Sequence, residues 1–207
     1  MFKLLLFDIV SLITILNPIA AAAIMLSLVK YSDIPEISKR TSLTVLAASV
    51  ITMLMGGMIL KIFGINIPSI KAIGGVVLLI ISLHMVQGKE IAPTNATKEE
   101  HTAAENKEDV AIIPLAIPVL FGPGVITTII VLSEKAHTIQ EKVILLISIL
   151  ISSIIIYVTL RNAIYVSKIL GINGLKIISR IMGLIIGAIA FLFLIGGIRA
   201  LWYANLQ

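Results

Sequence analysis

Long apolar segments separated by short polar stretches dominate this chain. Each segment has roughly 18 or more predominantly apolar residues, the length with which a helix crosses the hydrocarbon core of a bilayer. The six segments are residues 4–28, 41–62, 69–87, 111–133, 143–163 and 178–202. We therefore predict an all-α integral membrane protein with six transmembrane helices.

The first and fourth segments contain residues that interrupt a helix. Asn17-Pro18 stands inside the first, and Pro118 with Gly122-Pro123-Gly124 stands inside the fourth. Proline removes a helical hydrogen bond, and backbone groups freed within lipid must be sheltered by protein or line a polar cavity. Interrupted helices in corresponding parts of two halves are typical of a transporter binding site. We predict that the first and fourth helices are interrupted and that the two breaks form such a site.

The first segment also imitates a secretory signal peptide. Lys3, an apolar run and the small residues Ala20 to Ala22 resemble its three regions. Apolar sequence continues to Val29, however, beyond the supposed cleavage point. We therefore expect the segment to be retained as a helix.

Three short matches indicate an internal repeat. Lys61–Asn66 matches Lys168–Asn173 at an offset of 107 residues, Pro18 matches Pro123 at 105, and Lys71–Gly74 matches Arg180–Gly183 at 109. Each half holds three predicted helices, and an odd number of crossings makes the second copy enter from the opposite face. We predict two inverted three-helix repeats, 1–87 and 111–207. Between them, residues 88–110 form a polar linker with six acidic and three basic side chains.

The composition agrees with a membrane protein and limits its partners. Hydrophobic residues make up 58% of the chain and charged residues 13%. The net charge of +5 does not indicate nucleic-acid binding, because lysines and arginines stand in small groups between apolar segments. Counting them gives 10 on one side of the membrane and 6 on the other, which predicts that both termini lie outside.

The sequence contains no pattern typical of an enzyme. It has no cysteine, its three histidines are scattered without the spacing of metal ligands, and no nucleophile–base pair or P-loop is found. We therefore expect no catalytic residue, metal or cofactor.

The candidate binding residues surround the two breaks. We expect new helix N-termini at Ile19 and Val125 to direct unsatisfied N–H groups at an anionic group of a substrate. The alternative is two proline kinks packed against neighbouring helices. Hydroxyl groups near the breaks could bind substrate too, although membrane helices also use them for packing. The candidates are Asn17, Pro18, Gly122, Pro123, Gly124, Thr127, Thr128, Ser11 and Thr14.

Three charged residues lie in or beside the apolar segments. Asp8 is the only acid within one of them, so it is either a proton or cation coupling site or a residue at the membrane interface. Lys71 and Arg180 occupy the same position in the two repeats, as gating cations or as side chains that extend to the two interfaces.

Several motifs resemble the MarC family of bacterial inner-membrane proteins. They are Pro-Leu-Ala-Ile-Pro with Gly-Pro-Gly at 114–124, Phe-Gly-Ile-Asn-Ile-Pro at 63–68, Ser-Arg-Ile-Met-Gly at 179–183 and Gly-Gly-Ile-Arg at 196–199. The resemblance implies a six-helix protein of the cytoplasmic membrane, in a family that includes transporters of small neutral amino acids. Such proteins usually have Gly and Pro where this chain has Ala20 and Ala23, so we expect a shallower first break.

The sequence therefore favours a secondary transporter of a small solute, working by alternating access where the repeats meet. The family resemblance implies that this solute is a small neutral amino acid. A non-transporting scaffold and a channel are the alternatives. The expected partners are the lipid bilayer and a small-molecule substrate, and a homo-oligomer is compatible with the sequence.

Overall fold

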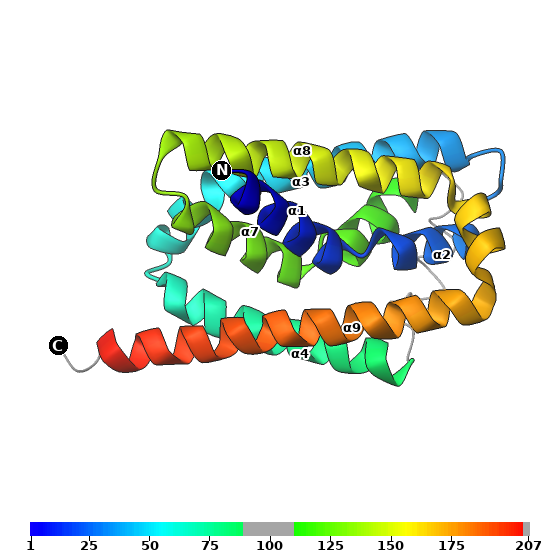
Figure 1. The fold of residues 1–207 in the computed structure, drawn as a ribbon. Coiled ribbons are helices and arrows are strands. Elements are labelled where there is room, and N and C mark those ends of the chain that lie inside the picture. Colours follow the sequence, from blue (N-terminus) through cyan, green and yellow to red (C-terminus); the bar gives the residue numbers. More distant parts are fainter. Residues whose placement is uncertain (89–109, 205–207) are drawn as a thin grey trace.

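The computed structural model describes residues 1–88 and 110–204, and this part of the chain folds into helices without a β-strand (Figure 1). The helices are α1 (Phe2–Leu16), α2 (Pro18–Leu28), α3 (Ile34–Ile62), α4 (Ile67–Gln87), η1 (Ala111–Leu120), α7 (Pro123–Lys135), α8 (Ile139–Arg161) and α9 (Ala163–Ala204). The start of α1 and the end of α9 lie at the same end of the bundle (Figure 1).

The described helices confirm five of the six predicted membrane spans by their length and apolar composition. Five of them are long and apolar enough to cross a bilayer, with α1 and α2 counted together as Phe2–Leu28, and η1 with α7 makes a sixth if that bent pair is one span. The predicted segments agree with these spans to within a few residues at most ends. The largest difference is at the start of α3, which begins seven residues earlier than the apolar pattern, at Ile34 rather than residue 41.

Both predicted interruptions are present, and the first is the shallower, as expected. Asn17 adopts a left-handed conformation, with φ 45° and ψ 62°, yet α1 and α2 continue as one span. In contrast, η1 and α7 meet at 62°. Within η1, Ile113 and Ile117 are extended, and each is followed by a proline, which disfavours helical dihedral angles in the residue before it.

The last helix also extends beyond its predicted span, through an arm that joins it at a glycine. The predicted sixth helix begins at residue 178, whereas α9 already begins at Ala163 and bends at Gly171, where φ is 59° and ψ is 178°. Glycine reaches positive φ without the steric cost that other residues incur. A short first arm of α9 therefore returns the chain to the bundle before the long arm crosses it.

The helices pack as two groups. The larger core joins buried residues of α1, α2, α3, η1, α7 and α8, whereas the smaller joins α4, α9 and Val131 of α7. Figure 1 shows α4 and α9 side by side along one face of the remaining helices. The third helix of the first predicted repeat thus packs against the third helix of the second.

Glycines allow α4 and α9 to approach closely. A Cβ placed on Gly75 would lie 2.5 Å from the backbone nitrogen of Leu194, and one placed on Gly197 would lie 2.6 Å from that of Ala72. No side chain fits in these places, because the atoms opposite belong to the backbone. Contact of this kind is typical of tightly associated membrane helices. The predicted linker at 88–110 falls almost entirely outside the described residues.

Candidate functional site

The two interrupted helices meet at one cavity. It has a volume of about 230 Å³, and both Asn17 and the stretch Gly122-Pro123-Gly124 line it. The lining is mostly apolar: Ile15, Leu16, Ala20, Ala21, Ile24, Ile81, Met85, Pro118, Val119, Leu120, Val125 and Ile186 complete it. The cavity therefore lies between the α1–α2 and η1–α7 breaks on one side and the α4–α9 pair on the other.

Asn17 supplies the polar side chain of this cavity. Its Oδ1 accepts a hydrogen bond from the Ala20 N–H at 3.4 Å, which caps the start of α2. Its Nδ2 donates to the sulfur of Met85 in α4 at 3.9 Å. Thioether sulfur is a weak acceptor. An oxygen of a bound molecule would therefore be a stronger partner for this amide group than Met85 is.

At the second break the N-terminal end of α7 faces the cavity, but the Val125 N–H is not the free hydrogen-bond donor that we expected. The Val125 N–H donates to the Gly122 carbonyl at 3.0 Å, and the Ile126 N–H donates to the same oxygen at 3.2 Å. The prediction of an unsatisfied N–H at Val125 is therefore wrong, because the first turn of α7 closes on Gly122. Pro123 stands at the first position of that turn, where a proline needs no N–H partner.

The four predicted hydroxyl residues are buried but do not line the cavity. Thr128 Oγ1 donates to the Gly124 carbonyl of its own helix at 2.8 Å. The methyl group of Thr127 packs directly against Gly74 of α4. Ser11 and Thr14 are buried in α1, on the part of the helix before the cavity. In this structure all four contribute to helix packing.

Asp8 is buried, with 3% of its surface exposed, and its Oδ1 has no hydrogen-bond partner among the described residues. Lys71 is half-buried, and a Cβ placed on Gly196 of α9 would lie 2.8 Å from its Nζ. The Nη2 of Arg180 in α9 would lie 3.2 Å from a Cβ on Gly88, which ends α4. None of the three lines the cavity.

Sequence reasoning missed the wall of the cavity that α4 and α9 provide. Ile81, Met85 and Ile186 form this wall. In the sequence they look like any other apolar residue of a spanning helix, so no signal separates a side chain that faces a cavity from one that faces lipid. In contrast, Pro118 stands beside Gly122-Pro123-Gly124 in the sequence, and its position there is a signal that could have placed it among the predicted binding residues.

Comparison with known proteins shows which family the chain matches. A family model described as MarC family integral membrane protein matches residues 2–202. A UPF0056 membrane protein of Methanocaldococcus jannaschii is 38% identical, with 91% of this chain and 93% of the relative covered. A UPF0056 membrane protein of Aquifex aeolicus is 33% identical, with 92% of this chain and 90% of the relative covered. The UPF0056 membrane protein YhcE of Escherichia coli is 26% identical, with 93% of this chain and 91% of the relative covered. No solved structure matches the chain.

Proposed function

The chain belongs to the MarC family of integral membrane proteins, and on that premise we propose that it transports a small solute across the membrane. The family resemblance read from the sequence is thereby confirmed. The observation that carries the proposal is the single cavity on which both helix breaks converge. Irregular backbone at membrane depth is tolerated where it lines a cavity, and discontinuous helices commonly form the substrate sites of transporters.

The size and lining of the cavity favour a small, mostly neutral cargo. Its volume of about 230 Å³ is below the roughly 300–1,000 Å³ of sites that hold drug-sized ligands. Among the described residues, no charged side chain lines the cavity. We propose a small neutral amino acid such as glycine or alanine, with its carboxylate near the Asn17 amide group and the N-terminal ends of α2 and α7. The positive ends of helix dipoles favour an anionic group there.

The inverted repeat is the second part of the proposal. Two contacts support it: Lys71 of α4 meets Gly196 of α9, and Arg180 of α9 meets Gly88 at the end of α4. The two cations are 109 residues apart and the two glycines 108. A pair of contacts with exchanged helices and a nearly constant offset is what a two-fold axis between α4 and α9 would produce.

The packing suggests which parts move. Because α4 and α9 approach backbone to backbone and supply all but one of the buried residues of the smaller core, we propose that they rock as one unit against the other helices. The cavity lies at the boundary between these two groups. A small rotation of the α4–α9 pair would then open the cavity to one side of the membrane and close it to the other.

We assign the coupling role to Asp8. A buried carboxylate in a spanning helix is costly and by default a candidate for carrying a proton or a cation. Asp8 is in α1, the helix whose far end carries Asn17 at the cavity. Loading and release of a cation at Asp8 could therefore act on the break through one rigid helix.

Uptake into proteoliposomes tests the transport proposal. Gly122→Leu adds a side chain to the lining at a position with φ −97°, outside the left-handed region. Its Cβ would lie 3.0 Å from the Pro118 carbonyl oxygen, a contact that a shift of a few tenths of an ångström relieves. We therefore expect uptake of radiolabelled glycine and alanine to be lost while the protein remains folded. Ala47→Leu, at an exposed site on α3, is the matched control and should transport normally. Folding is checked by circular dichroism and gel filtration. Wild-type uptake by a folded Gly122→Leu protein would reject the proposed site.

A further inference from the structure

A second cavity lies at one end of the bundle, away from the helix breaks. Its volume is about 430 Å³, and its lining comes from the C-terminal part of α3, the C-terminal end of α7 and the start of α8. Because α3 and α7 end here and α8 begins here, the cavity lies at the end of these helices. It shares no lining residue with the cavity at the breaks.

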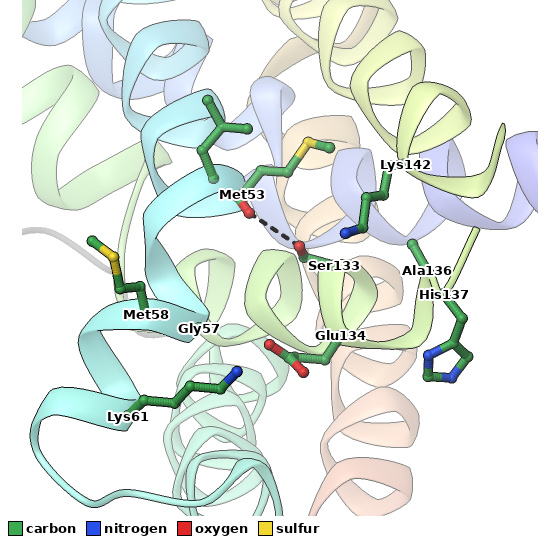
Figure 2. Close-up of a pocket in the computed structure, with 10 residues that line it drawn as sticks. Met53, Gly57, Met58, Lys61, Ser133, Glu134, Ala136, His137 and Lys142 are labelled. Carbon is green, nitrogen blue, oxygen red and sulfur yellow. Dashed lines mark hydrogen bonds between the residues drawn. The ribbon is translucent and has the colours of Figure 1, made fainter. Parts of the chain in front are cut away.

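Charged groups of both signs face this cavity. Figure 2 shows the Lys61 ammonium group and the Glu134 carboxylate turned toward one another, with the Lys142 ammonium group turned toward Ser133. Nevertheless, Glu134 forms no ion pair with either lysine in the described part of the chain. His137 completes the titratable groups of the lining. The cavity thus holds a carboxylate and two ammonium groups that face a shared space without neutralising one another directly.

The absence of a side chain at Gly57 gives the carboxylate its place. Glu134 Oε1 lies directly against Gly57 of α3, so a Cβ at this position would displace the carboxylate. One residue earlier in α7, Ser133 Oγ donates to the Met53 carbonyl of α3 at 3.0 Å, which fixes α7 against α3 (Figure 2). The position of the Glu134 carboxylate therefore depends on Gly57 being a glycine.

One side of the cavity is apolar and faces outward. Leu54 is 71% exposed and Met58 is 53% exposed, and both belong to a helix that spans the membrane. Large apolar side chains exposed on such a helix meet lipid acyl chains. A molecule in this cavity could therefore place a polar group among the charged residues while an attached chain lies along α3.

We propose that this cavity binds a zwitterion that carries a primary ammonium group and an anionic group. The anionic group would lie between Lys61 and Lys142, and the ammonium group would donate hydrogen bonds to Glu134. Ion pairs of this kind are charge-assisted and stronger than neutral hydrogen bonds. The headgroup of phosphatidylethanolamine and a free zwitterion such as O-phosphoethanolamine both have this chemistry. The inference does not rest on the transport proposal, since none of these residues lines the cavity at the breaks.

Binding to the purified full chain in detergent tests the inference, with dioctanoyl phosphatidylethanolamine as probe and native mass spectrometry as readout. Dioctanoyl phosphatidylglycerol, which has the phosphate but no amine, is the matched lipid. We expect the ethanolamine lipid to bind about tenfold more tightly than the glycerol lipid, a ratio that corresponds to about 1.4 kcal/mol. Glu134→Gln should abolish this preference, and Lys61→Gln with Lys142→Gln should weaken binding of both lipids.

Two further variants separate a binding site from general charge effects. Gly57→Ala keeps every charge but displaces the Glu134 carboxylate, so it should also reduce the preference for the ethanolamine lipid. Lys176→Gln removes an exposed charge from the long arm of α9, outside this cavity, and should change nothing. Circular dichroism confirms that each variant is folded.

Free O-phosphoethanolamine, measured by isothermal titration, identifies the source of the ligand. If it binds with the same dependence on Glu134, the ligand is a soluble zwitterion; if only the acylated form binds, the ligand is a lipid. Equal binding of the two lipids to the wild type and to Glu134→Gln, together with no binding of O-phosphoethanolamine, would overturn the inference. Neither result changes the uptake expected at the other cavity.

Discussion

The amide nitrogen of Asn17 lies 3.9 Å from the sulfur of Met85 and donates to it. This contact joins the break in the first span to α4, across the cavity that both residues line. Here a side chain of the larger helix group donates a hydrogen bond to a side chain of the α4–α9 pair. Substitutions at Asn17 can therefore distinguish its contribution to the stability of the backbone from its contribution to substrate binding.

Asn17→Gly should leave the protein stable but impair uptake. Glycine tolerates the φ of 45° at this position, and replacing a helix cap by glycine costs only a few tenths of a kcal/mol. Asn17→Ala should instead lower the free energy of unfolding by about 2 kcal/mol, because alanine loses the cap and lacks the polar side chain that lets asparagine tolerate the left-handed region. Unfolding in increasing denaturant measures the difference. Full uptake by Asn17→Gly would show that the amide group does not bind substrate.

Neighbouring glycines of α9 should respond differently to alanine. A Cβ on Gly197 meets backbone atoms of Ala72 and Pro68 at 2.6 and 2.7 Å, whereas the nearest atom to one on Gly196 is the Nζ of Lys71, the mobile end of a long side chain. We expect Gly197→Ala to destabilise the protein by about 1–3 kcal/mol, the usual cost of overpacking. Gly196→Ala should be nearly neutral. Equal thermal stability of the two variants would contradict the close approach of α4 and α9.

Thr41→Val should destabilise the irregular segment η1. Thr41 is fully buried, and its Oγ1 donates to the Ala111 carbonyl at 3.0 Å, which ties α3 to the first residue of η1. Valine has almost the same shape but leaves that buried carbonyl without this partner, at a cost of about 1–3 kcal/mol. Thr128→Val is the control, because Thr128 bonds only within α7. Hydrogen exchange at residues 111–120 should increase in Thr41→Val alone.

Asp8→Asn should preserve or raise stability and remove the coupling of uptake to an ion gradient. The Asp8 carboxylate is buried and its Oδ1 has no hydrogen-bond partner among the described residues, so neutralising it removes a desolvation cost. We expect the free energy of unfolding to change by no more than about 1 kcal/mol. Uptake is compared with and without an imposed proton or sodium gradient. A wild-type response to the gradient in Asp8→Asn would assign coupling elsewhere.

The sequence was sufficient for features that depend on local chemistry. The spans follow from apolar length, and the breaks at Asn17 and Gly122 follow from proline and glycine within those lengths. The cavity wall formed by Ile81 and Ile186 could not be predicted, because burial against a cavity and burial in lipid select the same side chains. Thr127 shows the same limit for hydroxyl groups, since packing against Gly74 and contact with substrate require the same residue type.

The backbone contact between α4 and α9 also constrains how the protein is made. During synthesis α4 leaves the ribosome about 100 residues before the long arm of α9, the helix that covers its glycine-lined face. Until then the face of α4 around Gly75 lacks the helix of its own chain against which it packs in the folded protein. The insertion machinery or lipid must occupy that groove first, so the last helix to enter the bilayer completes the assembly by displacing a temporary occupant.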